Sequence, residues 1–420
     1  MKKSILVISP YNPFTSDPGG SGNSIRNRLK HLSTFADVTL ITFRGSDHDS
    51  EAARKYNVTA AFIDRPFLPS KKSSSFRNLV DVLTGNLAVL CQYRAFAFAL
   101  GPTTHDMTEK KKFDLIQIED IVMAPIVAYL PETVPRLVFF HNVVSSYLKS
   151  VYCVSRGMKR RIAAGLEYLW MKRFERRMLS KFDMAVALTA KEYSLLRALS
   201  PSIPLYEIPL EVDVEVLIPQ PFSDTVTNIA FIGTMSYPPN EEAVLHFVKN
   251  IFPIIKRKEP NCKFYIVGRN PGLTVRQCGN EDVFVTGEVE NIPDKLRSIN
   301  IIVVPLLTGA GMRVKILEAF ALSKAVISTF LGAEGLHYQP GVDIIIADDP
   351  VCFADAVCAV MGNPEKAELL GIMGRKLVEL EYGSDKVWKK WLNLYARLFT
   401  DFRMTRKRLM PKELKNAPLS

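Results

Sequence analysis

The segment IIVVPLLTGAGMRVKILEAFALSKAVIS, residues Ile301 to Ser328, sets the architecture expected of this chain. It opens with a short β-branched run, and two glycines, Gly309 and Gly311, follow. Apolar residues then recur at helical spacing through Arg313–Ser323, and a second β-branched run follows at Ala325–Ser328. A strand, a glycine-rich turn, a helix and another strand in this order are typical of a parallel α/β sheet.

The same alternation continues in both directions and divides the chain into two halves. Between them, Ile203–Asn228 contains four prolines and is interpreted as a linker. Long helices are predicted at Asn240–Lys258 and Lys386–Arg403. Further strands are predicted at Ser4–Ser9, Val38–Phe43, Val58–Ile63, Leu115–Ile118, Leu137–Phe140, Ala185–Leu188, Ile229–Gly233, Phe264–Gly268, Val283–Thr286, Ile301–Pro305 and Ile344–Ala347.

This pattern predicts two doubly wound, Rossmann-like domains, at residues 1–205 and 225–385, followed by a C-terminal helix and basic tail at 386–420. The C-terminal helix is expected to cross back to the first domain. Ligands of doubly wound sheets bind at the carboxyl ends of the strands. The site is therefore expected in a cleft between the two domains, with residues from both.

Composition narrows the class of protein. The chain has 420 residues, of which 47% are hydrophobic and 23% charged, which excludes a mainly disordered or fibrous protein. The 54 Lys and Arg against 43 Asp and Glu leave a net charge of +11, which favours anionic partners. Six scattered cysteines indicate a reducing, cytoplasmic compartment. No apolar stretch approaches the ~18 residues of a membrane span, so we expect a soluble or peripheral protein.

The glycine-rich turn before Arg313–Ser323 is interpreted as a diphosphate site. Gly309 and Gly311 allow close approach of a ligand, and the helix N-terminus offers unpaired N–H groups and a positive dipole end. Arg313 and Lys315 add cations where the dipole disfavours them, a cost that a bound anion offsets. The alternative is that both are solvated surface cations beside an ordinary loop.

Glu318 follows on the same helix, three residues after Lys315. A carboxylate behind a diphosphate site can accept hydrogen bonds from two ribose hydroxyls. The alternative is an i, i+3 ion pair with Lys315 on an exposed face. The residues by themselves leave both readings open.

Four ordered motifs in the second half resemble a known family. They are IAFIGTMSYPPNEEAVLHF (Ile229–Phe247), PNCKFYIVGRNP (Pro260–Pro271), VFVTGEVENIPDKL (Val283–Leu296), and KILEAFALSKAVIST followed by GAEGL. In the first half, SPYNPFTSDPGGSGNSIRNRLKHL and FFHNVVSSY are similar to the same family. The chain resembles retaining GT-B glycosyltransferases of the family-4, or glycosyl transferases group 1, type.

The resemblance implies transfer of a sugar, with retention of anomeric configuration, from a nucleotide-diphosphate sugar to a polysaccharide or lipid-linked acceptor. It implies His141 and Glu318 as catalytic residues, with His141 facing the donor sugar or the acceptor hydroxyl. Lys315 and Arg313 would hold the diphosphate and Glu318 the ribose, while the backbone at Gly268 and Glu288–Val289 would bracket the base. The full donor-binding set is Gly20, Gly233, Thr234, Gly268, Glu288, Val289, Gly309, Gly311, Arg313, Lys315 and Glu318.

Fixed cations and helix N–H groups stabilise charge that builds on a leaving diphosphate, so we predict a metal-independent reaction without a cofactor. The chain departs from the family pattern at several positions. Ala310 stands where the family has the first of two glutamates, which leaves the donor sugar open. Thr234 and Met235 replace a basic pair, and PLEVD (Pro209–Asp213) replaces the usual PNGVD.

Two single features have simpler readings. His141 is also compatible with a structural histidine at a strand end. The glycine cluster Asp17–Gly22 is also compatible with a plain turn.

Basic residues concentrate in Arg156–Arg177, where aromatic residues interleave with them, and again in the tail from Arg403 to Lys415. This arrangement favours contact with an anionic membrane at its inner face over nucleic acid, which is not expected as a partner. The blander alternative is a solvated helix face with buried aromatics.

The sequence therefore predicts a cytoplasmic glycosyltransferase that builds a cell-surface polysaccharide or glycolipid. Two other functions remain open at this point. One is a GT-B sugar-nucleotide epimerase, and the other is a non-catalytic basic protein that binds membrane or nucleic acid.

Overall fold

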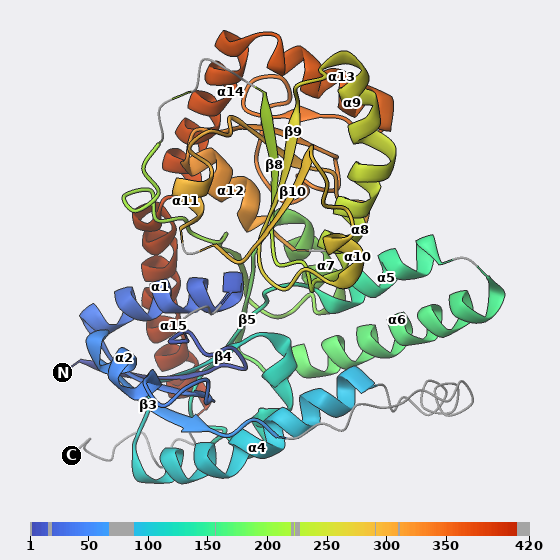
Figure 1. Ribbon diagram of the computed structural model, residues 1–420. Coiled ribbons are helices and arrows are strands. Elements are labelled where there is room, and N and C mark those ends of the chain that lie inside the picture. The colour runs from blue at the N-terminus through green and yellow to red at the C-terminus, as the bar shows by residue number, and fades with distance from the viewer. Residues whose placement is uncertain are drawn as a thin grey trace. The chain divides into compact units, whose positions relative to one another are not determined.

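The computed structural model describes residues 2–15, 19–66, 88–155, 157–219, 222, 227–289, 291–309 and 311–409. The chain divides into two compact units. The first comprises Met1–Ile208 together with Trp388–Ser420, and the second is Pro209–Val387. Each unit contains one parallel sheet with helices packed around it (Figure 1). The predicted fold class, two doubly wound α/β domains, is confirmed.

The sheet of the first unit has seven parallel strands in the order β3-β2-β1-β4-β5-β6-β7. Their bounds are β1 Lys3–Ile8, β2 Ala36–Phe43, β3 Val58–Ile63, β4 Leu115–Glu119, β5 Arg136–Phe139, β6 Met184–Ala187 and β7 Leu205–Glu207. The central strands are buried on both faces, which is why they appear in the sequence as continuous apolar runs rather than alternating ones.

Helices cover both faces of this sheet. One face packs on α4 (Ala88–Lys110), the 3₁₀ segment η1 (Ile121–Tyr129), α6 (Met158–Leu179) and α7 (Ala190–Leu199). Strand β5 reaches α15 (Ser384–Leu409) on the other face, where Phe139 lies 5.5 Å from Trp391 between ring centres. The remaining helices among the described residues of the unit are α1 Gly19–Phe35, α2 Asp49–Lys55 and α5 Val144–Val154.

The C-terminal helix α15 returns to the first unit, as predicted. Trp388, its first residue in that unit, stacks on His31 of α1 at 4.9 Å between ring centres. Farther along, the Tyr395 hydroxyl donates to the Gln117 side chain of β4 at 2.6 Å. These aromatic contacts explain why Trp and Tyr recur at helical spacing in a segment that is otherwise strongly basic.

The sheet of the second unit has six parallel strands in the order β10-β9-β8-β11-β12-β13. The strands are β8 Asn228–Ile232, β9 Lys263–Val267, β10 Val283–Gly287, β11 Ile301–Val304, β12 Ala325–Ser328 and β13 Ile345–Ile346. The helices are α8 Pro238–His246, α9 Phe252–Lys258, α10 Leu273–Arg276, α11 Ile292–Lys295, α12 Val314–Ala321, α13 Pro350–Met361 and α14 Pro364–Leu377, with π turns at Phe247–Ile251 and Val378–Tyr382.

Two predictions of local structure were wrong in detail. The predicted linker Ile203–Asn228 contains the edge strand β7, because Leu205–Glu207 pairs with β6 despite the prolines around it. The predicted helix Asn240–Lys258 is interrupted by the π turn Phe247–Ile251. Pro253, in the first turn of α9, lacks the N–H that a continuous helix would need, which explains the break.

In both sheets the strand order reverses direction beside the first strand. The reversal falls between β1 and β4 in the first unit and between β8 and β11 in the second. The loops on either side of such a switch point diverge to opposite faces of the sheet and leave room for a ligand at the carboxyl ends of the strands. Each unit therefore has one favoured place for a site.

Candidate active site

In the second unit, the loops after β8 and β9 approach each other closely. Gly268, directly after β9, has φ of +147°, and a Cβ atom built on it would lie 1.9 Å from the carbonyl oxygen of Gly233. Gly233 directly follows β8, and its amide donates to Val267 of β9. Only glycine fits at position 268, so the two loops form a tight floor beside the switch point.

We expect Gly268→Ala to lower the free energy of unfolding by about 2 kcal/mol or more, because the new methyl group displaces backbone rather than a flexible side chain. In a domain of this size that corresponds to a melting temperature lower by roughly 4–8 °C. Gly272→Ala is the matched control, since Gly272 has an ordinary φ of −63° and its nearest atom would lie 3.5 Å from the added carbon. Equal melting temperatures for the two variants would contradict this reading of Gly268.

Lys315, in the first turn of α12, is held at the switch point by three neighbours. Its Nζ donates to Asn240 Oδ1 at 2.6 Å and lies 4.0 Å from the centre of the Phe231 ring. Asn240 in turn donates from Nδ2 to the Thr234 carbonyl at 2.9 Å. A Cβ on Gly233 would lie 2.9 Å from the ammonium, so this group is pressed against the β8 loop. The side chain is therefore fixed rather than solvated.

Arg313 is the N-cap residue of α12, and the residue is 7% exposed. Its Nη1 donates to the Gly311 carbonyl at 2.8 Å. The loop can fold around the guanidinium because Gly309 and Gly311 have φ of +128° and +81°. Ala310 lies outside the described residues. The alternative reading of Arg313 as a solvated surface cation is wrong.

Lys315 and Glu318 are both partly buried, and each influences the other's charge. Burial, with the nearby Arg313, lowers the pKa of Lys315 well below its ordinary value, against an opposing effect of Glu318. Burial raises the pKa of Glu318 to about 7, although Lys315 opposes the rise. Two ionisable groups whose charged forms are disfavoured by burial, at the end of a parallel sheet, form a candidate ligand site.

A further cation reaches the β8 loop from β9. Arg269 donates from Nε to the Thr234 hydroxyl at 3.3 Å. Met235, the second residue in place of the family's basic pair, is 1% exposed and packs into the core. At the β8 loop, a positive charge is therefore supplied by Arg269, which follows the end of β9.

The other predicted donor-binding residues are placed as follows. Glu288 and Val289 follow β10, with Glu288 exposed. Gly20 lies in the first turn of α1 in the first unit, whereas Asp17 and Pro18 of the predicted glycine loop lie outside the described residues.

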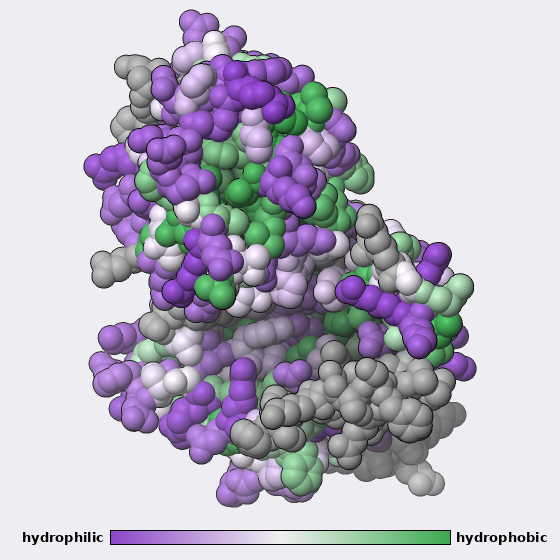
Figure 2. Space-filling view, turned by 45° about the vertical axis from the view of Figure 1, so that its right-hand side comes forward, coloured by the Kyte–Doolittle hydropathy of each residue, from purple (hydrophilic) through white to green (hydrophobic). Residues whose placement is uncertain are grey.

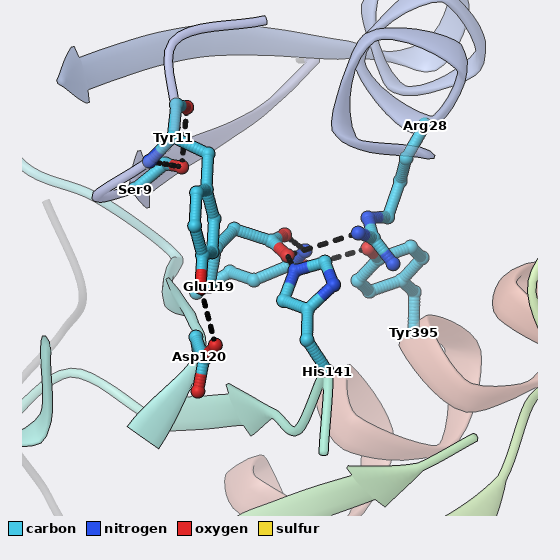
Figure 3. A network of polar contacts seen from close by, with 8 residues as sticks. Ser9, Tyr11, Arg28, Glu119, Asp120, His141 and Tyr395 are labelled. Atoms are coloured by element: carbon cyan, nitrogen blue, oxygen red, sulfur yellow. Dashed lines mark hydrogen bonds and ion pairs between the residues drawn. The ribbon is translucent and has the colours of Figure 1, made fainter. Parts of the chain in front are cut away.

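In the first unit, His141 belongs to a buried polar network at the β1–β4 switch point (Figure 3). Its Nε2 lies 3.5 Å from Oε2 of Glu119, the last residue of β4. The same oxygen accepts from Arg28 Nη2 of α1 at 2.9 Å. His141 is 7% exposed, and its ring is flanked edge-on by Phe139 and Tyr11.

Next to this histidine, Asp120 adopts a strained backbone conformation, with φ of +76°. Its side chain accepts from the Tyr11 hydroxyl at 2.9 Å. Burial raises the pKa of Asp120, while His141 and Tyr11 counteract part of that rise. Residues with a strained backbone and buried residues with a shifted pKa cluster at functional sites more often than in hydrophobic cores.

The sequence contains an Asp-x-Asp triplet at Asp47–Asp49, and its last residue, Asp49, is the first residue of α2. Asp49 is buried and accepts hydrogen bonds from Asn12, from Ser46 and from the amide of Gly45. Its role in the described structure is to hold the turn before α2.

A comparison with models of known protein families identifies the family of the second unit. Residues 226–363 match the model of the family described as Glycosyl transferases group 1. The second unit carries a glycosyltransferase group 1 domain. The resemblance of its four motifs to glycosyl transferases group 1 is thus confirmed.

A relative and several solved structures are similar to nearly the whole chain. The chain is 22% identical over 398 residues to an uncharacterized 44.6 kDa protein in the cps region of Klebsiella pneumoniae, with 91% of this chain and 97% of that protein covered. Its fold is similar to sucrose-phosphate synthase of Thermosynechococcus elongatus, with a TM-score of 0.71 at 16% identity over 95% of this chain and 100% of the other.

Two further similar structures contain ligands. HepE of Anabaena, solved with UDP and glucose, has a TM-score of 0.66 at 11% identity over 94% and 99% of the two chains. A variant of S. aureus TarM, solved with fondaparinux, alpha-GlcNAc-glycerol and UDP, has a TM-score of 0.65 at 12% identity over 95% and 100%. At these identities, the similarity establishes the GT-B fold.

Several residues of the glycosyltransferase group 1 domain and of the first unit were not predicted. Asn240 and Arg269 stand inside motifs that were recognised, yet neither was identified as a contact of the β8 loop. In the first unit, Glu119 and Arg28 were missed beside His141. A weak signal did exist for Glu119, since an acidic residue directly ends a buried strand.

Proposed function

We propose that this protein transfers a sugar from a nucleotide-diphosphate sugar to an acceptor hydroxyl, with retention of anomeric configuration. The observation that carries the proposal is the fixed ammonium of Lys315, held between Asn240 and Phe231 beside the glycine-rich turn and the N-terminus of α12. Backbone N–H groups, a helix dipole and an immobilised cation together form a site for a diphosphate.

In this reaction the bond between the anomeric carbon and the diphosphate oxygen breaks, and a bond to the acceptor oxygen forms. The acceptor hydroxyl loses its proton to the leaving phosphate oxygen or to water. Positive charge develops on the sugar and negative charge on the diphosphate. Lys315 and Arg313 stabilise the leaving group, Glu318 accepts the ribose hydroxyls, and His141 contacts the donor sugar or the acceptor hydroxyl.

The reaction is proposed to need neither a metal ion nor a cofactor, since the cations lie on the protein itself. Arg269 at the β8 loop supports this, because it supplies the charge that Thr234 and Met235 lack. We propose that the acceptor is a polysaccharide or a lipid-linked glycan that is destined for the cell surface. We also propose that the protein acts in the cytoplasm. The cps-region protein of Klebsiella pneumoniae and the TarM complex with alpha-GlcNAc-glycerol support an acceptor of this class.

A thermal-shift screen against UDP-, GDP-, ADP- and TDP-sugars tests the donor, because a ligand that binds the folded protein raises its melting temperature. We expect one nucleotide series to give a shift that persists in excess EDTA. Product analysis of the matching transfer reaction by NMR then establishes the anomeric configuration. No shift with any series, at millimolar ligand, would refute the proposal.

Helix α6 supports a second proposal, peripheral contact with an anionic membrane. Its exposed face combines basic residues with apolar side chains, and Met158, Ile162 and Leu169 are 75%, 52% and 54% exposed. In Figure 2, turned so that the side of α5 and α6 comes forward, hydrophilic and hydrophobic side chains lie next to each other on this part of the surface. An interfacial helix has this composition. No helix in the described part of the chain is long and apolar enough to cross a membrane.

Reversing two charges of this face, Lys159→Glu with Arg160→Glu, is expected to weaken binding to vesicles containing phosphatidylglycerol by about tenfold or more, since each cation near an anionic surface is worth about 1 kcal/mol. Sedimentation with the vesicles measures the effect. Lys389→Glu with Lys390→Glu is the matched control, because it makes the same charge change on the exposed face of α15. Equal losses in both variants would show that only net charge matters.

A further inference from the structure

The polar network around His141 centres on Glu119, which contacts Arg28, Gln117 and His141. Glu119 is fully buried, and both of its carboxylate oxygens are engaged. Oε1 accepts from Gln117 Nε2 at 2.6 Å, and Oε2 accepts from Arg28 at 2.9 Å. A buried carboxylate with both oxygens bonded cannot rotate without breaking a charge-assisted hydrogen bond.

The next shell of this network comes from the C-terminal helix. The Arg28 guanidinium lies 4.2 Å from the ring centre of Phe139 and 4.5 Å from that of Trp391, so it is stacked between two aromatic rings. Tyr395 donates to Gln117 Oε1 at 2.6 Å and fixes the orientation of that amide. Helix α15 therefore supports the position of the Glu119 carboxylate through the two residues that donate to it, Arg28 and Gln117.

The charge of Glu119 is maintained despite its burial. Burial by itself raises the pKa of this carboxyl, but Arg28, with smaller contributions from His141 and Gln117, outweighs it and leaves the pKa below its ordinary value. Glu119 is thus an anion that lies 3.5 Å from His141 Nε2. A lone pair on Nε2 would face this anion in a buried site, whereas an N–H there is attracted to it.

We propose that Glu119 is a positioning residue that, whenever the His141 ring carries a single proton, keeps that proton on Nε2 and leaves the Nδ1 lone pair available to a substrate hydroxyl. The Nδ1 edge of the ring is turned away from both Glu119 and Asp120 (Figure 3). A hydroxyl of the donor sugar or of the acceptor would donate to that nitrogen. The part of this inference that concerns the hydroxyl rests on the proposed function, whereas the tautomer does not. Carboxylates that fix the tautomer of a functional histidine act in this way in other sites.

The tautomer is measured directly by long-range ¹H–¹⁵N correlation NMR of ¹⁵N-histidine-labelled full-length protein, with the His141 signals assigned by their loss in His141→Gln. In the wild type we expect protonated Nε2 and unprotonated Nδ1. In Glu119→Gln, which keeps the shape but removes the charge, we expect both nitrogens to share the proton. A wild-type ring protonated at Nδ1, or an unchanged pattern in Glu119→Gln, would overturn the proposal.

Activity separates positioning from a merely structural role. Glu119→Gln is expected to lower kcat about 10- to 100-fold, the usual range for a residue that orients a functional histidine. The Kd for the free nucleotide should not change, because the proposed diphosphate residues belong to the second unit. Glu175→Gln, measured at pH 8 or above, is the control, since burial raises the pKa of this other buried carboxyl of the first unit to about 7 and the group, which accepts from the Ser145 amide, is then mostly ionised. It should leave the His141 tautomer unchanged.

A second variant covers the case in which Glu119→Gln does not fold, since that change leaves Arg28 buried without its anion. Tyr395→Phe removes only the bond to Gln117 and is expected to shift the tautomer partly and lower kcat by a smaller factor. A wild-type spectrum and kcat in Tyr395→Phe would contradict the role of α15. If His141→Gln transfers sugar at the wild-type rate while the tautomer responds as expected, the positioning by Glu119 stands and the proposed function of His141 falls.

Discussion

Lys315→Met is expected to lower kcat/KM for sugar transfer by about 100- to 1,000-fold while the fold remains intact, the usual loss when one preorganised donor to a developing anion is removed. Methionine preserves the length and most of the volume of the side chain, so Phe231 keeps an apolar neighbour. The loss should appear mainly in kcat, because the charge on the diphosphate is greatest as it leaves. Steady-state kinetics with the donor identified by thermal shift measures it.

The same variant gives a second, independent readout. Because burial and Arg313 lower the pKa of Lys315 in the free protein, a bound diphosphate raises it again. Nucleotide binding should therefore take up protons at a pH that lies above the lowered pKa of Lys315 and above about 8, where Glu318 is already mostly ionised. Calorimetry in two buffers with different ionisation enthalpies detects this uptake in the wild type, and its absence is expected in Lys315→Met. Lys366→Met, at an exposed position of α14, should show wild-type kinetics and wild-type uptake.

How much the sequence could predict depended on whether the contacts are local. Lys315, Glu318 and the glycines before them lie within one turn and one helix, so their spacing alone predicted a diphosphate site, although it left the role of Glu318 open. Asn240 is 75 residues from Lys315, and Arg28 is 91 residues from Glu119. The hydrophobic periodicity of the sequence cannot predict such contacts, because it is the strand order of the sheets that brings the two residues together.

Local departures from regular structure had local causes that the sequence did contain. The π turn at Phe247–Ile251 follows from Pro253, although an unbroken apolar periodicity masked it. Strand β7 was missed because proline-rich composition outweighed its three paired residues. The buried position of Arg28 had no signal of this kind, since a basic residue in an amphipathic helix is usually exposed.

Glu318→Ala is expected to remove the preference for a nucleotide with ribose over one with deoxyribose. If the carboxylate accepts hydrogen bonds from two ribose hydroxyls, each bond to the charged group contributes about 1.5–3 kcal/mol. The wild type should then bind a ribonucleoside diphosphate at least about tenfold more tightly than its 2′-deoxy analogue, and the variant should bind both equally. Glu368→Ala, an exposed glutamate of α14, is the control that should keep the preference.

The pKa of about 7 at Glu318 fixes the direction of a pH effect that an ordinary glutamate would not show. Because burial raises this pKa, the carboxyl is mostly protonated at pH 6 and mostly ionised at pH 8. The ionised form is the one that accepts two ribose hydroxyls, so nucleotide affinity should rise by up to about tenfold between those values. In Glu318→Gln, which cannot ionise, this rise should be absent. The same pH dependence of affinity in the wild type and in Glu318→Gln would place the ribose contact on another residue.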